Sequence, residues 1–428
     1  MALSADDFQL RKVALPVYLP TLLFTAGEAA MIPVIPVLAK KLGADLAGAG
    51  LVASMITLGV LLGDLPSGWF VAKVGERAAM LWSSLLALVG SILGVTAGSV
   101  LQLAIGVGLI GLSLTVFALA RHAFLTTFVP LSYRARALSL LGGMFRGGLV
   151  AGPLLSAVIL AWLGDPRWAF GLTIFFTLAT VAVLLFMTDP ESEFAGAAKV
   201  ASGDDSHLTA GEDELESETH NVFASVWNNR KVLLRLGIGA SLVGAIRTAR
   251  SVVFPLWAVS IGLPESQTAL ILGLSGLLDF ALFYTSGQVM DRWGRLASVL
   301  PSILIMGLST VFLAFTHNWT SAAAMFIICV FVFAFGNGLG SGIILTLGSD
   351  LAPQTNPAPF LGAWRFMVDA GSGVAPLAIA GVTAVTSLAL ATGLLGVAGV
   401  VGTLVMLRYI PRFIPRVRNG AIADERLP

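Results

Sequence analysis

Long apolar runs recur along the whole chain, and they limit what it can fold into more than any other feature. About a dozen stretches are long enough for the roughly 20-residue helix that crosses a bilayer, and short segments rich in Gly, Pro or charge separate them. The chain is 57% hydrophobic and 11% charged, whereas soluble domains are about 45–50% apolar. We therefore predict an all-α membrane protein and exclude a soluble globular fold.

The apolar runs predict twelve transmembrane helices. We place them at residues 13–38, 46–71, 78–98, 100–128, 137–163, 168–188, 233–260, 267–290, 296–316, 321–351, 358–385 and 388–409. The 47 glycines fit such a bundle, because small residues let lipid-embedded helices approach closely. The first run is full length and has no small-residue cleavage site, so we expect no cleavable signal peptide.

The sequence also repeats itself. An offset of 219 residues carries Gly68 onto Gly287, and an offset of 223 carries Pro153 onto Pro376. Two parallel halves around an axis along the membrane normal, with a site between them at the midplane, are the general plan of a rocking transporter. The repeat therefore predicts two pseudo-symmetric six-helix bundles.

An acidic segment joins the two halves. Ten of the 24 acidic residues lie within 189–218, and residues 189–230 have almost no aliphatic runs, so this segment cannot bury enough surface to fold alone. We divide the chain into four parts, which are an N-terminal six-helix bundle at 1–188, a cytoplasmic acidic linker at 189–230, a C-terminal six-helix bundle at 231–410 and a cytoplasmic tail at 411–428.

The distribution of Lys and Arg predicts the orientation in the membrane. Cytoplasmic loops retain these residues, and nearly all of them fall on one side of the predicted bundle, whereas the other side has only Lys40, Lys41 and Arg167. We therefore expect a multi-pass protein of the plasma or inner membrane with both termini in the cytoplasm.

A Gly-x-x-x-Asp-Arg-x-Gly-Arg stretch ends the eighth predicted helix, and an altered copy ends the second. It resembles the signature loop of the major facilitator superfamily, which lies between helices 2 and 3 and again between helices 8 and 9. The first copy has Ala72 where that family has Asp. The resemblance implies that these residues pair across the halves in one conformation and separate in the other, whereas anchoring of the topology by their positive charge is the alternative. The gate-motif residues are Gly68, Lys73, Gly75, Arg77, Gly287, Asp291, Arg292, Gly294 and Arg295.

A second motif lies in the fifth predicted helix. Gly148-Leu-Val-Ala-Gly152-Pro153 resembles the Gly-x-x-x-Gly-Pro portion of a motif found in drug and metabolite antiporters of the superfamily. The wider pattern is incomplete, because Ser139 and the pair after Leu155 replace expected glycines. The resemblance implies proton-coupled efflux.

Charged residues inside spanning helices cost at least ~2.5–3.5 kcal/mol each on insertion scales, so each is a candidate functional residue. In the resembled fold, helices 1, 4, 7 and 10 line the cavity, helix 2 packs near helix 11, and helix 5 packs near helix 8. This implies contacts between the halves from Asp64 to Arg365 and from Arg146 to Asp279. The residues expected in the substrate cavity are Glu28, Arg121, His122, Arg247, Arg250, Asn337, Trp257 and Trp364.

Three carboxylates are candidates for proton coupling. Our hypothesis is that Glu28 carries the proton, because burial disfavours a charged carboxylate and a nearby arginine moderates that effect; a permanent ion pair with Arg121 or Arg247 is the alternative. Asp369 and Asp279 are the others. Asp369 either relays a proton or neutralises Arg365, which lies four residues earlier.

Three cavity residues have a second interpretation. An unperturbed histidine titrates near neutrality, which makes His122 a candidate proton-binding residue, but a lone histidine beside an arginine is more often a hydrogen-bonded packing residue. Trp257 and Trp364 either stack on the substrate or anchor helix ends at the membrane interface. The Phe335–Gly342 stretch is glycine-rich but has no Lys-Ser/Thr sequel, so it indicates close helix packing, with Asn337 as a polar cavity group.

The remaining motifs narrow the class of function. The sequence has no Walker motif, no metal-ligand spacing and no catalytic cluster, so we expect no enzyme, no cofactor and no nucleic-acid partner. A channel explains polar helices but not a duplicated gate motif. We expect a monomeric secondary transporter whose partners are the bilayer, protons and a small-molecule substrate. Our main hypothesis is proton-coupled efflux of a drug or metabolite; the alternative is a proton-coupled or facilitative importer of a sugar or organic anion, or a transporter of a lipid-linked substrate.

Overall fold

The computed structural model describes residues 18–128, 131–186, 230–352 and 358–413. Within these ranges the chain is helical, and twelve helical spans are long and apolar enough to cross a membrane, which confirms the predicted number. The predicted linker, apart from Arg230, and the tail from residue 414 onward lie outside the described residues.

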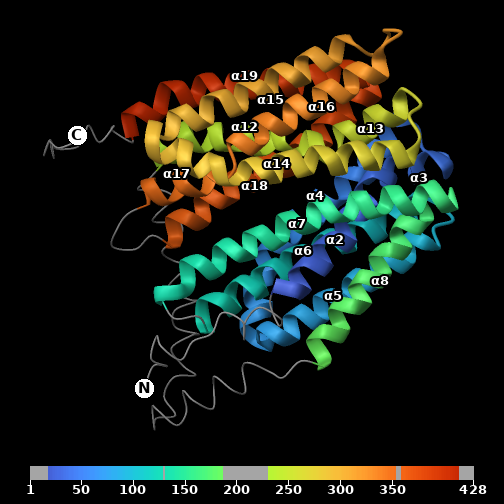
Figure 1. Cartoon of the computed structure of the whole chain (residues 1–428), viewed down its shortest axis with the longest axis horizontal. Coiled ribbons are helices and arrows are strands. Elements are labelled where there is room, and N and C mark those ends of the chain that lie inside the picture. Colours follow the sequence, from blue (N-terminus) through green and yellow to red (C-terminus); the bar gives the residue numbers. More distant parts are fainter. Residues whose placement is uncertain (1–17, 129–130, 187–229, 353–357, 414–428) are drawn as a thin grey trace, which may run out of the picture.

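The first half of the chain forms one bundle (Figure 1). Its first span is made of three pieces, and the other five spans are single helices. The elements are α2 (Leu19–Met31), η2 (Ile32–Val34), α3 (Ile35–Lys41), α4 (Leu46–Val74), α5 (Glu76–Val95), α6 (Val100–Phe128), α7 (Leu131–Leu163) and α8 (Arg167–Phe186).

The second half forms the other bundle, drawn from yellow to red in Figure 1. Its seventh and tenth spans are also made of shorter pieces. The elements are α11 (Arg230–Val232), the π-helical η4 (Leu233–Gly237), α12 (Ile238–Arg247), η5 (Thr248–Arg250), α13 (Val253–Ser260), α14 (Glu265–Trp293), α15 (Arg295–Phe315), α16 (Ala322–Leu339), α17 (Ile343–Leu351), α18 (Ala358–Val385) and α19 (Leu388–Phe413).

The two halves repeat the same backbone turns. Gly75 between α4 and α5 has a φ of 83°, and Gly294 between α14 and α15 has a φ of 87°. Gly43 and its repeat partner Gly262 have φ values of 95° and 73°. L-residues with a side chain rarely adopt this region, so these glycines are required by the turns. The sequence offset of 219 residues is therefore also a repeat in three dimensions.

Three spans that the sequence predicts as continuous helices are interrupted. The first is broken by the 3₁₀ turn η2, which contains Pro33, and the seventh by the 3₁₀ turn η5. The tenth is broken between α16 and α17, where Gly342 takes a left-handed conformation with φ 80°. Proline lacks the backbone N–H and glycine tolerates positive φ, so both residues allow a helix to end inside the membrane when other groups bind the freed carbonyls.

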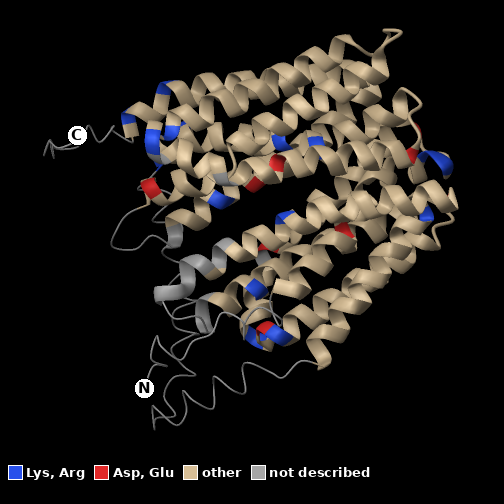
Figure 2. Ribbon diagram, viewed as in Figure 1, with Lys and Arg blue, Asp and Glu red and all other residues tan. Residues whose placement is uncertain are grey.

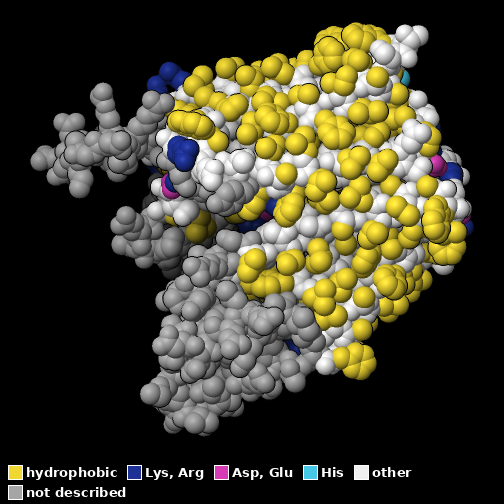
Figure 3. All heavy atoms as spheres, viewed as in Figure 1, with side chains coloured by type: hydrophobic (Ala, Val, Ile, Leu, Met, Phe, Trp, Pro, Cys, Tyr) yellow, Lys and Arg dark blue, Asp and Glu magenta, His cyan; other side chains and the backbone are white. Residues whose placement is uncertain are grey.

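Apolar side chains cover much of the described surface on the face of the bundles that Figure 3 shows. Leu62, Leu101, Phe315 and Val385 are among the large hydrophobic residues that are exposed. On a soluble protein a surface of this kind is a binding or aggregation site. On twelve membrane-spanning helices it is the surface that contacts lipid.

Among the described residues, the two halves share a hydrophobic cluster near one end. We call the end with the Gly75 and Gly294 turns the motif end, and the end with the Gly43 and Gly262 turns the opposite end. One hydrophobic cluster near the opposite end contains residues of both halves, among them Leu38, Leu103 and Phe254. Toward the motif end, one described cluster contains only first-half residues and another only second-half residues. The ribbons accordingly converge at α3 and α13 and diverge near α17 (Figure 1).

Candidate functional site

Charged residues occur within the helical bundles as well as at their ends (Figure 2). Those of the described part that concern the site form three groups. The first contains Glu28 and Arg121, the second surrounds Asp279, and the third contains Asp64, Arg365 and Asp369.

Close helix packing fixes the position of Glu28 on α2. A side chain at Gly148 would lie 2.9 Å from the Ala26 nitrogen, and one at Gly152 would meet the backbone of Ala26 and Ala30. On the other side of α2, Thr173 Oγ1 of α8 donates a hydrogen bond of 2.6 Å to the Gly27 carbonyl. The glycines of the helix-5 motif therefore let α7 pack directly on α2, which explains them without reference to the direction of transport.

Glu28 and Arg121 form the buried charge pair of the first half. Glu28 is 6% exposed and Arg121 is 7% exposed. Arg121 is the charged group that acts on Glu28, but no ion pair to Glu28 is present among the described residues, and Glu28 Oε1 lacks a hydrogen-bond partner there. Arg121 lies over the ring of Phe145 at 5.1 Å, with its Nε and Nη1 unbonded in the same part of the chain. The two charges thus lie near each other without a fixed bond.

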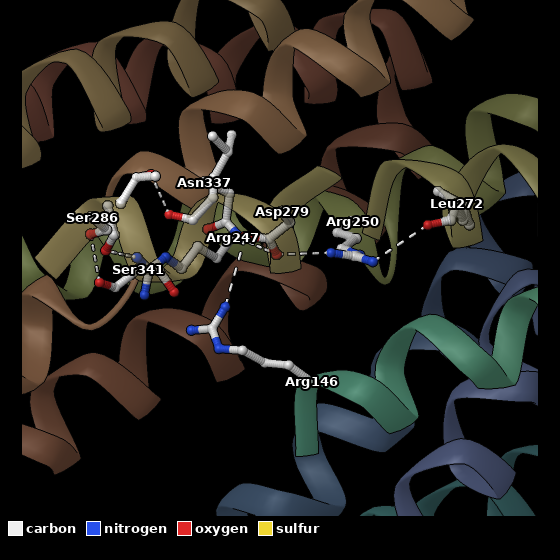
Figure 4. Close-up of polar contacts among 11 residues, drawn as sticks. Arg146, Arg247, Arg250, Leu272, Asp279, Ser286, Asn337 and Ser341 are labelled. Carbon is white, nitrogen blue, oxygen red and sulfur yellow. Dashed lines mark hydrogen bonds and ion pairs between the residues drawn. The ribbon is translucent and has the colours of Figure 1, made fainter. Parts of the chain in front are cut away.

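Asp279 on α14 is the centre of the second group (Figure 4). Its Oδ2 accepts hydrogen bonds from Arg250 Nη1 at 3.1 Å and from Asn337 Nδ2 at 2.9 Å. Its Oδ1 lies 3.8 Å from Arg146 Nη1, which comes from α7 in the other half. The structure therefore brings together Arg146 and Asp279, as the resembled fold implied, and adds Arg250 and Asn337 to them.

Arg247 lies in the same group and binds the break in the tenth span. Its Nη2 donates to the Gly340 carbonyl at 2.9 Å. Ser286 Oγ donates to the Ser341 carbonyl at 2.8 Å, and Ser298 Oγ donates to the Leu339 carbonyl at 2.6 Å. Three consecutive carbonyls at the interruption, those of residues 339–341, thus each accept a side-chain donor. Partners of this kind are what a non-helical segment inside a membrane requires.

The third group lies where α4 and α18 pack together across the halves. Arg365 Nε is 3.3 Å from Asp369 Oδ2 on the next turn of its own helix. Asp64 is close enough to Arg365 and Asp369 for their charges to act on its carboxylate. It forms no ion pair with Arg365, which pairs with Asp369 instead. Of the two partners that the sequence offered for Arg365, the structure pairs it with Asp369.

The basic residues of the gate motif bind within their own halves. Arg77 Nη2 donates to the Leu184 carbonyl at 2.7 Å, at the end of α8. Arg295 Nε is 2.8 Å from Asp350 Oδ2, at the end of α17. Lys73 lies 4.9 Å from the centre of the Trp69 ring, and Arg292 is exposed. The side chain of Asp291 is not among those described, although its backbone lies in the last turn of α14.

Both tryptophans that the sequence places in the substrate cavity are core residues in this conformation. Trp257 is 0% exposed, belongs to the cluster shared by the halves and meets the ring of His317 edge-on. Trp364 lies in the second-half cluster and donates its Nε1–H to the Ile344 carbonyl at 2.9 Å. His122, by contrast, is exposed, with Arg365 and Arg121 among the charges that act on it.

Several features of the site are absent from the sequence-based prediction. These contacts join residues that share no sequence motif. They are the hydrogen bond from Asn337 to Asp279, the hydrogen bonds to the three carbonyls at the break, and the ion pair between Lys41 and Glu265 at 3.5 Å. The break itself had a signal, because Gly340 and Gly342 interrupt an apolar run, and such interruptions mark binding sites in transporters. In the described part of the chain, no group of three or more His, Cys, Asp or Glu side chains is placed to hold a metal ion.

These features define a class of protein, the twelve-helix secondary transporter built of two repeated bundles. Residues 17–376 match the model of the Major Facilitator Superfamily, so the chain belongs to that family and is a transporter, not an enzyme. The galactose-proton symporter of Escherichia coli (strain K12) is 24% identical over 328 residues, which cover 71% of this chain and 70% of the symporter.

Solved structures share the fold. A crystal structure of a D-xylose-proton symporter covers 95% of this chain and 99% of its own, with a TM-score of 0.71 and 14% identity. A crystal structure of the peptide transporter POT in complex with sulfate covers 93% of this chain and 95% of its own, with a TM-score of 0.70 and 16% identity. At these identities the likeness concerns the fold alone.

Proposed function

We propose that the protein imports a small polar solute together with protons, and that Glu28 carries the proton. The observation that supports this role is a carboxylate inside the first span that is almost fully buried and has no fixed partner among the described residues, with one arginine acting on it. A carboxylate held in a permanent ion pair would have little freedom to exchange its proton.

The named relatives favour import over the efflux that the helix-5 motif implied. The relative that spans most of this chain is a symporter for galactose and protons. The glycines of the helix-5 motif are explained by the packing of α7 on α2, where a side chain at Gly148 or Gly152 would meet the α2 backbone. They therefore carry no independent argument for an antiporter.

The chemistry follows from the charge of the Glu28–Arg121 pair. When Glu28 holds a proton the pair has a net charge of +1, and when the proton leaves the pair is neutral. Because electrostatic interactions are strong in a dry interior, this change of one charge alters how the first half holds a solute and how it packs on the second half. In our proposal the proton enters from the opposite end and leaves at the motif end, which the positive-inside rule places in the cytoplasm.

Glu28→Gln in proteoliposomes tests the proposal. Glutamine keeps the shape of the side chain but cannot release a proton, so we expect solute accumulation driven by an imposed pH gradient to be lost. Exchange of labelled for unlabelled solute across the membrane should remain, because it needs no net proton movement. The measurement is uptake with a pH-sensitive dye inside the vesicles. Accumulation and proton entry equal to those of the wild type would show that Glu28 is not the carrier.

A further inference from the structure

The polar group around Asp279 has more positive than negative charge. Arg146, Arg247 and Arg250 supply three guanidinium groups, and Asp279 supplies the carboxylate that acts on all of them. Buried charges are normally paired, because an uncompensated charge in low dielectric is costly. The group therefore has the charge balance of a site that accepts an anion.

The three arginines are not equally engaged. Arg250 is held by Asp279 and by the Leu272 carbonyl, and Arg247 is held by the Gly340 carbonyl. Of the three, Arg146 has the loosest contacts among the described residues, which are the 3.8 Å ion pair with Asp279 and a position over the Phe283 ring at 4.4 Å. Its guanidinium can therefore bind a new partner with the smallest loss of existing interactions.

The group also has unbonded polar atoms and is partly exposed to solvent. Arg247 Nε is buried and has no hydrogen-bond partner among the described residues, and neither has the Asn337 Oδ1 acceptor. The side chains of Arg146 and Arg250 are each 24% exposed, so the group is reached by solvent. Figure 4 shows Arg146 extending from α7 toward the second-half residues that surround Asp279.

We infer that this group binds an anionic group of the substrate, so that the transported solute is a small organic anion, such as a sugar acid, and not a neutral sugar. This inference rests on the proposed function and names its substrate class. The incoming carboxylate replaces Asp279 as the partner of Arg146, because the planar guanidinium matches a carboxylate with two parallel hydrogen bonds. Asp279 keeps Arg250 and Asn337, and the bound anion then lies between the two halves.

Two pairs of compounds test the substrate class. One pair is D-galactose and D-galacturonate, and the other is D-glucitol and D-gluconate. In the second compound of each pair one alcohol carbon is oxidised to a carboxylate, so the two compounds are nearly equal in size and differ in charge. We expect the carboxylate of each pair to bind the purified full-length protein at least about tenfold more tightly than its neutral partner, because a hydrogen bond to a charged group is stronger than one between neutral groups. The measurement is titration calorimetry in a buffer without carboxylates. Equal binding within each pair, or no binding by either carboxylate, overturns the inference.

Two substitutions separate recognition from a structural role. Arg146→Gln should abolish the preference for the carboxylate, and Asp279→Asn should preserve or increase it, because Asp279 competes with the ligand for Arg146. A purely structural ion pair predicts that both substitutions act in the same direction, and that result overturns the inference. Arg412→Gln, at the end of α19, is the matched control and should change nothing. If Arg146→Gln does not yield a monodisperse protein, Arg146→Lys keeps the charge and should still lose most of the preference.

The result of these binding experiments is independent of the transport test of Glu28. Calorimetric binding needs no pH gradient, so the carboxylate preference of the wild-type protein is measured independently of proton coupling. Proton-driven uptake restricted to neutral sugars would overturn the anion inference and leave the proposed coupling intact. Carboxylate binding in a protein that shows no proton-driven uptake would support the inference and contradict the coupling.

Discussion

At the scale of single residues, the site depends on a position without a side chain. The guanidinium of Arg250 crosses α14 beside Gly276, where a Cβ would overlap its Nη2 and would lie 3.5 Å from Val150 of the other half. Arg250 reaches both Asp279 and the Leu272 carbonyl by this route. A glycine in the middle of a helix destabilises it by about 0.5–1 kcal/mol relative to alanine, so Gly276 is explained by the arginine that passes it.

Gly276→Ala should therefore displace Arg250 from Asp279. We expect a loss of roughly 1–3 kcal/mol of stability from overpacking, seen as a lower thermal unfolding midpoint in detergent, together with weaker solute binding. Gly381→Ala on α18 is the control, because nothing lies near its Cβ. If both variants unfold at the wild-type temperature and bind equally, Arg250 does not need that gap.

Sequence reasoning found the charged residues of the site but not all their partners. Each charged residue could be recognised from the sequence, because placing an ionisable group inside a membrane-spanning apolar run costs free energy. The contact of Arg146 with Asp279 followed from the order of helices in the resembled fold, and that of Arg365 with Asp369 from their spacing of four. The bond from Asn337 to Asp279 had no such signal, because it depends on how far two helices are rotated about their axes.

At the scale of helices, hydropathy predicted the number and approximate positions of the spans but not their interruptions. Hydropathy reports whether a run is long and apolar, and α16 followed by α17 remains apolar throughout. The break depends on backbone conformation at Gly342 and on donors from α12, α14 and α15, which belong to other parts of the sequence. The local sequence allows the break because glycine tolerates a positive φ, and tertiary contacts stabilise it.

Gly342→Ala tests the importance of the break. The residue has a φ of 80°, and an L-residue with a side chain costs about 1–2 kcal/mol in the left-handed region. We expect a lower unfolding midpoint and slower solute exchange, because α17 would no longer hold its orientation relative to α16. Gly362→Ala is the control, since it lies inside α18 with open space around it. Wild-type stability and exchange in Gly342→Ala would rule out a requirement for this conformation.

At the scale of the whole molecule, the described residues close the structure at the opposite end, whereas the described hydrophobic clusters toward the motif end each belong to one half. Lys41 and Glu265 join α3 to α14 across the opposite end at 3.5 Å. Arg77 and Arg295 of the gate motif, in contrast, each contact a residue of their own half. This is the arrangement expected of a state that is open toward the motif end.

Reversing one charge of this ion pair should favour opening of the opposite end. Lys41→Glu places two acids together, and because exposed pairs contribute about 0–1 kcal/mol, we expect the populations to shift by up to about fivefold. The measurement is the distance between spin labels at Lys40 and Gln267, both exposed, in a Cys329→Ser background. The double reversal Lys41→Glu with Glu265→Lys should restore the wild-type distribution. If it does not, the contact has no role in the closure.

The hydrophobic cluster shared by the two halves has a thermodynamic consequence. Phe254, Trp257 and Leu103 are fully buried at the opposite end because residues of both bundles cover them. When the halves separate there, part of this apolar surface meets water or solute, and exposure of apolar surface raises the heat capacity. The free-energy difference between the two transport states is then a curved function of temperature, so that cooling and warming change their populations unequally.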